Sequence, residues 1–114
     1  MAECLFCAIV AGEIPATTVL ETDRILAFRD VNPQAPVHIL IIPTDHVSSA
    51  TSLGGGRGAV LGEIFATAEH LAKAEGIDQS GWRLVTNNGP DAGQSFAHLH
   101  FHLLGGRRMG WPPG

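Results

Sequence analysis

Residues 98–104 run His98-Leu99-His100-Phe101-His102-Leu103-Leu104, an alternation of imidazole and apolar side chains. In a β-strand, successive side chains point to opposite faces, so one face carries the three histidines and the other carries the apolar residues. Thr, Lys or Ser would solvate a polar face equally well, so we interpret the histidine face as functional. Imidazole can ligate a metal, transfer a proton or attack an electrophile such as phosphorus.

The rest of the chain predicts a sheet and two helices around this segment. Apolar runs bounded by turn residues predict strands at residues 19–21, 24–28, 37–42, 82–86 and 97–104. Helices are predicted at residues 4–11, closed by Gly12, and at residues 59–75, closed by Gly76. Short connections favour antiparallel pairing, which predicts an α+β fold with about five strands, one long helix and one short helix in a single domain, 1–114.

Composition excludes several classes of protein. The chain has 114 residues, of which 45% are hydrophobic, enough for one core but too few for two domains. Seven Lys and Arg against 11 Asp and Glu give a net charge of −4, and the only basic run is Arg107-Arg108, so we expect no nucleic-acid partner. No apolar block approaches the ~18 residues of a membrane span, and the N-terminus has no basic region before an apolar block. We therefore expect a cytoplasmic protein that does not enter a membrane.

Two glycine-bearing segments are expected to be loops. Residues 54–58 predict a flexible surface connection between the two halves of the domain. Residues 87–95, which supply glycines, amides and a hydroxyl at the start of the histidine strand, allow two interpretations. The segment is either an ordinary connection or a nest of backbone N–H groups for an anion. Oxyanion donors beside a nucleophile are what acyl or phosphoryl transfer requires.

Residues 98–104 also match the His-x-His-x-His-x-x mark of the histidine-triad hydrolases, in which x is apolar. The resemblance extends along the chain to Ile14-Pro15-Ala16, Leu26-Ala27-Phe28, Asp30, Pro33-Gln34-Ala35-Pro36, His38, Ile42-Pro43, His46, Gly93-Gln94-Ser95 and Leu104-Gly105-Gly106-Arg107. The ending Trp111-Pro112-Pro113-Gly114 is typical of the Hint branch, the purine nucleoside phosphoramidases. The chain therefore resembles a Hint-type member of this family.

The resemblance implies a function for individual residues. His100 is implied to be the nucleophile that attacks the α-phosphorus of an adenosine 5′-phosphoramidate and forms a nucleotidyl-histidine, from which water releases AMP. His102 and Ser95 are implied to bind phosphate oxygens, and His38 to be a further active-site histidine. The remaining implied nucleotide contacts are Asp30 at the ribose hydroxyls with Val31 beside it, Asn87, Gly93 and Gln94 along the phosphate, and Trp111. A homodimer is also implied, with the tail over residues 109–114 reaching the partner's cleft.

Cys4 and Cys7 are the only cysteines, and their spacing suits a metal or a redox pair better than a structural disulfide. A thioredoxin-like pair follows a strand, and only three residues precede Cys4, which disfavours that interpretation. The resemblance to bacterial family members implies that both cysteines ligate zinc together with His46 and His98. A closed Cys₂His₂ site leaves no position for a reacting water, so this Zn²⁺ is expected to be structural.

Two other functions stay open at the level of sequence. A dinucleoside polyphosphate hydrolase uses the same middle histidine but usually lacks the Trp-Pro-Pro-Gly ending. Outside the enzymes, the alternative is a zinc-containing nucleotide-binding or regulatory protein with little turnover. Gly110 stands where family members often carry a larger residue, so the sequence does not predict the leaving group. His70 is expected at the surface, and Trp82 in the core or an interface.

Overall fold

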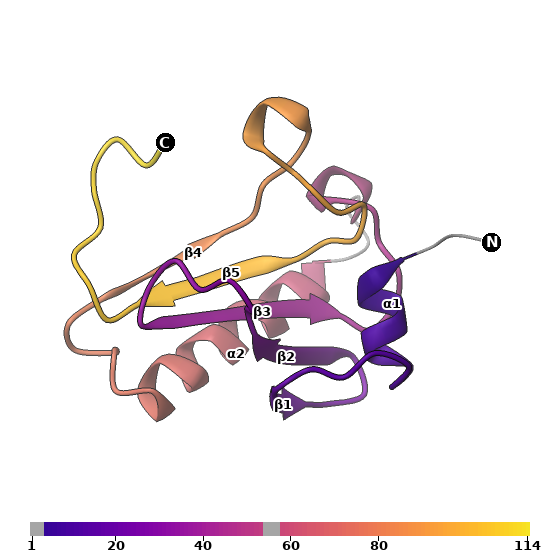
Figure 1. Ribbon diagram of the computed structural model, residues 1–114, viewed down its shortest axis with the longest axis horizontal. Helices are drawn as coiled ribbons and strands as arrows, with labels where there is room; N and C mark the ends of the chain where they lie inside the picture. The colour runs from indigo at the N-terminus through magenta and orange to yellow at the C-terminus, as the bar shows by residue number, and fades with distance from the viewer. Residues whose placement is uncertain (1–3, 54–57) are drawn as a thin grey trace.

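The computed structural model of the chain describes residues 4–53 and 58–114. One antiparallel sheet has the order β1-β2-β3-β5-β4, with bounds β1 (Thr18–Glu21), β2 (Ile25–Arg29), β3 (Val37–Pro43), β4 (Trp82–Val85) and β5 (Phe101–Gly105). Helix α2 (Gly58–Ala74) packs on one face of the sheet, and the short helix α1 (Leu5–Val10) packs on the other (Figure 1). The predicted α+β fold is confirmed. Most of the predicted glycine connection, residues 54–57, lies outside the described residues.

Strand β3 is buried on both faces because each face has its own helix. Ile39 and Ile41 belong to the core under α2, whereas Leu40 and Ile42 belong to a second core with Phe6 of α1. A strand covered on both sides is continuously apolar, as residues 39–42 are. The sheet thus holds α1 against the face opposite α2.

Helix α1 brings the two cysteines to its first turn. Cys4 is the N-cap, and its Sγ accepts a hydrogen bond from the Cys7 backbone N–H at 3.3 Å. At the other end, Gly12 takes φ +79°, and the Glu13 N–H returns to the Ala8 carbonyl. This left-handed C-cap is the one that Gly12 predicted, because glycine adopts positive φ without steric cost.

The predicted strand at residues 97–104 is wrong at its start, since β5 begins only at Phe101. The backbone ahead of it bonds elsewhere: the Leu99 N–H donates to the Val47 carbonyl, and the His100 carbonyl accepts from the Thr86 hydroxyl at 2.9 Å. The first two histidines of the triad therefore lie outside the ladder. Side chains still alternate there, because Leu99 packs in a small core with Val47 and Leu53.

The remaining expectations concern His70, Trp82 and membrane-spanning segments. His70 is exposed on α2, and Trp82 is half-buried against the core under α2, with its ring 5.8 Å from that of Phe65. Two short 3₁₀ helices, Ala50–Leu53 and Pro90–Ala92, were not predicted. Within residues 4–53 and 58–114, no helix has the length and apolar character needed to cross a bilayer.

Candidate functional site

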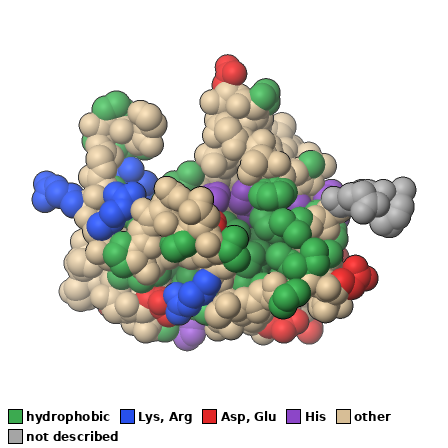
Figure 2. All heavy atoms as spheres, in the orientation of Figure 1, with side chains coloured by type: hydrophobic (Ala, Val, Ile, Leu, Met, Phe, Trp, Pro, Cys, Tyr) green, Lys and Arg blue, Asp and Glu red, His purple; other side chains and the backbone are tan. Residues whose placement is uncertain are grey.

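The three histidines at positions 98, 100 and 102 line the side of the sheet that carries α1. His98 and His100 are buried, and the ring centres of His100 and His102 lie 5.1 Å apart. Phe6 of α1 packs edge-on against both His98 and His100. Figure 2 shows histidine side chains reaching this surface beside a patch of hydrophobic side chains. The shared face that the alternation predicted is therefore present.

The ring of His100 is held by its own backbone. Its Nδ1 lies 2.8 Å from the carbonyl oxygen of His98. A carbonyl oxygen only accepts hydrogen bonds, so the proton is on Nδ1. A neutral imidazole carries one N–H, and Nε2 of His100 therefore keeps its lone pair. This is the form of the ring that can attack an electrophile.

His38 and His102 form a second hydrogen-bonded unit beside His100. The Gln34 backbone N–H donates to His38 Nδ1 at 3.0 Å, so the proton of the neutral His38 ring is on Nε2. His38 Nε2 donates to His102 Nδ1 at 2.8 Å and lies 3.3 Å from Asp30 Oδ2. His102 must then carry its proton on Nε2. Its free edge is a hydrogen-bond donor.

Burial keeps both of these imidazoles neutral. Desolvation lowers the pKa of His38 despite the opposing effect of the Asp30 carboxylate. Desolvation, together with the neighbouring His100 and His38, lowers the pKa of His102 to about 4. At pH 7 the unit therefore presents a neutral N–H group.

Asp30, His38 and His102 lie close enough together to suggest a cation site. The hydrogen bond from the Gln34 N–H to His38 Nδ1 argues against one. A metal at His38 Nε2 would need a ring without any proton, or would have to break that bond. We therefore assign these three side chains to hydrogen bonding.

A different cluster has the chemistry of a metal site. One ligand atom from each of Cys4, Cys7, His46 and His98 lies within 4.8 Å of the others. Nδ1 of His98 is 3.2 Å from Cys4 Sγ and 3.5 Å from Cys7 Sγ, and Nδ1 of His46 is 3.2 Å from Cys7 Sγ. Tetrahedral zinc, with bonds of about 2.0 Å to nitrogen and 2.3 Å to sulfur, places its ligand atoms about 3.3–3.8 Å apart.

The surroundings of this cluster also fit a cation. His98 Nε2 donates to the Pro43 carbonyl at 3.1 Å, which leaves the Nδ1 lone pair facing the sulfurs. Desolvation and the Cys4 thiol raise the pKa of Cys7 to about 11, and a bound cation would reverse that effect by stabilising the thiolate. Two sulfur and two imidazole donors suit Zn²⁺.

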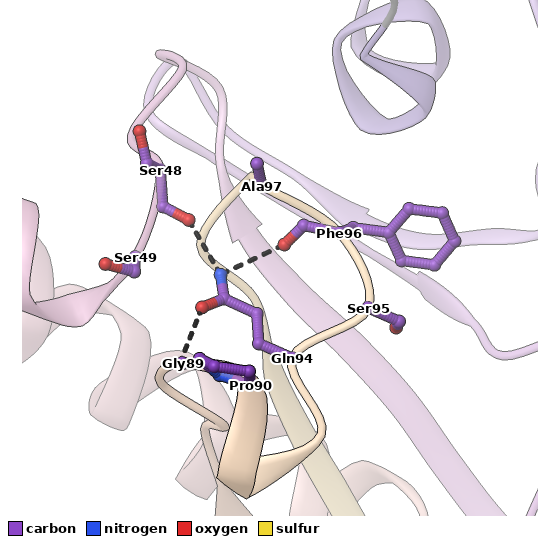
Figure 3. Close-up of a pocket in the computed structure, with 8 residues that line it drawn as sticks. All are labelled: Ser48, Ser49, Gly89, Pro90, Gln94, Ser95, Phe96 and Ala97. Carbon is purple, nitrogen blue, oxygen red and sulfur yellow. Dashed lines mark hydrogen bonds between the residues drawn. The ribbon is translucent and has the colours of Figure 1, made fainter.

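Gln94 holds the loop ahead of the triad through its side-chain amide. Its Nε2 donates to the carbonyls of Ser48 and Phe96, and its Oε1 accepts from the Gly89 N–H (Figure 3). These groups border a cavity of about 330 Å³. With its amide bonded on both sides, Gln94 fixes the shape of the loop.

Only some of the donors in this loop are free to bind an anion. The N–H groups of Gly93 and Gln94 donate to the carbonyls of Pro90 and Gly89. Ser95 is exposed, and neither its N–H nor its hydroxyl has a hydrogen-bond partner among the described residues. Ser95 therefore keeps two free donors on the loop.

The other predicted nucleotide contacts differ in their positions. Asp30 adjoins His38, and its Oδ1 accepts from the Asn32 N–H at 2.8 Å. Val31 is 98% exposed, and Asn87 is half-buried just beyond β4. Trp111 is 83% exposed on the C-terminal tail, which continues from the end of β5 (Figure 1).

Comparisons with known proteins agree with this geometry. The model of the HIT domain family matches residues 11–109. The chain belongs to the HIT family. That one domain spans residues 1–114 stays a prediction.

Individual relatives narrow the assignment within the HIT family. A HIT family hydrolase from Legionella pneumophila Philadelphia 1 superposes with a TM-score of 0.96 at 51% identity, covering 98% of this chain and 100% of that one. A 14 kDa zinc-binding protein from Brassica juncea is 47% identical over 112 residues, 96% of this chain and 98% of the relative. Adenylylsulfatase HINT1 from Arabidopsis thaliana is 46% identical over 112 residues, 96% and 76% of the two chains, and supports the Hint branch.

Sequence reasoning missed one part of this HIT site, an apolar surface next to the histidines. Phe96 is 41% exposed, and its ring centre lies 5.0 Å from that of Phe6 and 6.3 Å from that of His100. The signal was available in the sequence, because Phe96 is a large apolar side chain in the segment just ahead of the triad. Exposed apolar side chains beside polar groups mark ligand sites.

We expect the stability of this HIT protein to fall between pH 6.5 and about 4. The unfolded His102 binds a proton near pH 6.5, whereas the folded one, packed against Asp30, His38 and His100, stays neutral down to about pH 4. In that window the unfolded state binds more protons, so the free energy of unfolding decreases as the pH falls. Urea unfolding at several pH values measures the slope.

His102→Asn is the matched variant, because it keeps a polar side chain that does not titrate. Both proteins are compared at equal metal loading, so that proton competition at the cysteines affects them alike. A wild-type slope no steeper than that of His102→Asn would contradict this assignment.

Proposed function

We propose that the protein hydrolyses purine nucleoside 5′-phosphoramidates through a nucleotidyl intermediate on His100. The observation that carries this proposal is the hydrogen bond from His100 Nδ1 to the His98 carbonyl, which leaves Nε2 free to attack. The family relationship to hydrolases supports the same chemistry. A turnover assay with adenosine 5′-phosphoramidate tests it, and release of no AMP would favour the regulatory alternative.

The reaction proceeds in two displacements at phosphorus. His100 Nε2 forms a bond to the α-phosphorus as the bond to the amine breaks, and the amine leaves with a proton from solvent. Water then attacks phosphorus and loses a proton to solvent, the bond between phosphorus and Nε2 breaks, AMP departs, and Nε2 recovers its lone pair. One difficult displacement is thereby divided into two easier ones.

Neighbouring residues bind the substrate in this proposal. The N–H of His102 Nε2 and the free N–H and hydroxyl of Ser95 donate to phosphoryl oxygens as charge accumulates there. The Asp30 carboxylate accepts from the ribose hydroxyls, and the base lies on the apolar surface at Phe96 beside His100. Gly93, Gln94 and Asn87 shape the phosphate side of the site.

A second candidate substrate has the same AMP group with a different leaving group. The Arabidopsis relative is named as an adenylylsulfatase, and its 46% identity favours testing adenylylsulfate here. Attack by His100 would then expel sulfate instead of an amine. Rates for adenosine phosphoramidate, AMP-lysine, adenylylsulfate and a dinucleoside tetraphosphate, compared as kcat/KM, discriminate among these substrates and the polyphosphate alternative.

His100→Ala should lose turnover while its affinity for AMP stays close to that of the wild type. Only the covalent step needs this imidazole, and loss of a nucleophile costs on the order of 10⁴-fold or more in rate. Ser95→Ala should lose about 10²–10³-fold, as expected for one oxyanion donor. Single-turnover rates and calorimetric binding of AMP measure the two effects separately.

His70→Ala is the matched histidine control, since His70 is exposed on α2 and outside the proposed site. It should keep the wild-type rate. If His100→Ala retained near-native turnover, the assignment of the nucleophile would be wrong.

We propose that Cys4, Cys7, His46 and His98 hold one structural Zn²⁺. The spacing of the four ligand atoms and the second hydrogen bond of His98 support it, as does the name of the Brassica relative. With four protein ligands, the ion supplies folding stability and no reacting water.

Free thiols held for a cation fit a reducing compartment, and we propose a cytoplasmic location.

Protein purified under reducing conditions without chelator should contain about one zinc per chain. Elemental analysis measures it, and Cys4→Ser should lower both the zinc content and the thermal midpoint. Metal-free protein of undiminished stability, with both thiols freely alkylated, would contradict the zinc site. Mass measurement of the purified chain excludes a Cys4–Cys7 disulfide as the cause.

We also propose a two-fold homodimer. Leu61 and Phe65 are 40% and 52% exposed on α2, and the Phe65 ring packs beside Trp82 of β4, which is an edge strand of the sheet with unpaired backbone groups. The exposed Trp111 is attached to the same edge, because Arg83 of β4 donates to the Gly110 carbonyl. In a dimer built here, the tail reaches the partner's cleft.

Light scattering at micromolar concentration should give twice the mass of the chain. Deleting residues 109–114 should change the preference among leaving groups more than it changes the free energy of unfolding, because the tail lies outside both cores. Deletion of the tail with unaltered substrate preference, or a monomeric mass, would refute this arrangement.

A further inference from the structure

His100 occupies a segment of backbone that the sheet does not hold. The ladder between β3 and β5 runs from Ile41 opposite Phe101 to Val37 opposite Gly105, so it starts one residue after His100. The imidazole nevertheless needs a fixed orientation, since its Nδ1 must reach the His98 carbonyl. The contacts of residues 98–100 therefore set the geometry of His100.

Three contacts fix these residues. The Thr86 hydroxyl donates to the His100 carbonyl, and the Leu99 N–H donates to the Val47 carbonyl. The third contact is the side chain of His98, with Nε2 on the Pro43 carbonyl and Nδ1 at the sulfurs of the metal cluster. Of the three contacts, only that of the His98 side chain depends on whether the cluster holds a metal.

His98 therefore connects the cluster to His100, through its ring on one side and its backbone carbonyl on the other. Its ring faces the four-ligand cluster, while its carbonyl accepts the Nδ1 proton of His100 at 2.8 Å. The Leu99 N–H bond to Val47 holds the peptide plane that contains this carbonyl, and a metal bond to Nδ1 would fix the same residue from its side chain. Outer-shell partners that orient metal ligands change metal affinity or activity by about 10–100-fold, and we expect an effect of the same order for His98 acting on His100.

A second path runs through α1. Phe6 lies between the two cysteines in sequence and packs edge-on against His98 and His100, with ring centres 5.8 and 5.1 Å apart. Cysteine ligands at positions 4 and 7 anchor the first turn of α1 to the cluster, and therefore this ring as well. The cluster is thus connected to His100 from two sides.

We propose that the Cys4–Cys7–His46–His98 cluster is a positioning device for the nucleophile: a bound metal holds His98 so that His100 keeps its Nδ1 proton and a free Nε2. This inference rests on the proposed function and assigns the cluster an effect on the chemical step in addition to stability. Unloading the cluster should slow transfer of the nucleotide to His100 and leave nucleotide affinity nearly unchanged.

The test compares His46→Ala with His46→Cys, both in the full-length protein. His46 is the exposed ligand and belongs to neither core, and its ring contacts Cys7 and His98 within the cluster, so its replacement acts on the cluster and spares both cores. Alanine opens the site, whereas cysteine restores a four-ligand Cys₃His set that zinc accepts. Glu75→Gln is the stability control, because it removes the ion pair with Arg29 on the α2 side of the sheet, opposite the face that carries the triad.

Two readouts are taken with zinc present and after removal of zinc by a chelator. Nitrogen-15 spectra of the histidine rings report which nitrogen of His100 is protonated, without any substrate. Single-turnover nucleotidyl transfer and AMP affinity report the chemical step and binding. We expect zinc removal, or His46→Ala, to weaken the His100 Nδ1–H signal and to slow transfer by about 10–100-fold. His46→Cys should recover both, and Glu75→Gln should change neither.

An intact Nδ1–H signal together with an unchanged transfer rate in folded, zinc-free protein would overturn the proposal. If zinc-free protein unfolds, the test is the comparison of His46→Ala with His46→Cys, both in the presence of zinc. Equal rates of nucleotidyl transfer in these two variants would overturn the proposal. Failure of the proposed function looks different: zinc-loaded wild-type protein would show the protonated Nδ1 but form no nucleotidyl intermediate.

Discussion

The hydrogen bond from His100 Nδ1 to the His98 carbonyl is the interaction on which the site depends. It leaves the lone pair of Nε2 free, at the opposite side of the ring from the carbonyl. A neutral imidazole with a fixed protonation pattern requires no proton transfer before it attacks. The sheet, the two helices and the cluster of cysteines and histidines all bear on this one contact.

Packing on both faces of β3 supports the geometry of this hydrogen bond. The core under α2 holds the strand, and Leu103 anchors β5 in that core one residue beyond His102. The opposite core places Phe6 against the rings of His98 and His100. His38, on β3 itself, then fixes the ring of His102 through a bond of 2.8 Å. His102 on β5 is therefore oriented through β3, whereas His100 lies in the segment just ahead of β5.

Much of this architecture was predictable from the sequence because hydrophobic periodicity is local. The apolar run of β3 and the helical spacing of α2 identified both elements, and Gly12 and Gly76 marked the ends of the helices. The start of β5 was not predictable, since alternation continues through residues 98–100 although the backbone there bonds to Val47 and Thr86. Only tertiary contacts distinguish a strand from an extended segment with the same pattern.

The candidate site was likewise predictable from the sequence only in part. The triad and the four candidate ligands follow from residue types and their resemblance to a family, and the structure brings each set together. The protonation pattern does not follow from sequence, because it depends on which carbonyl or amide faces each ring nitrogen. The apolar surface at Phe96 also depends on tertiary packing, because the contact of its ring with Phe6 joins the loop ahead of the triad to α1.

Location of the covalent bond in the trapped intermediate tests the central claim most directly. Acid-stable derivatives are not expected, so the reaction is quenched in base during a single turnover, and the nucleotidyl peptide is analysed by mass spectrometry and by phosphorus–nitrogen coupling. The structure predicts phosphorus on Nε2 of His100. Phosphorus on Nδ1 of His100, or on His102 or His38, would contradict it.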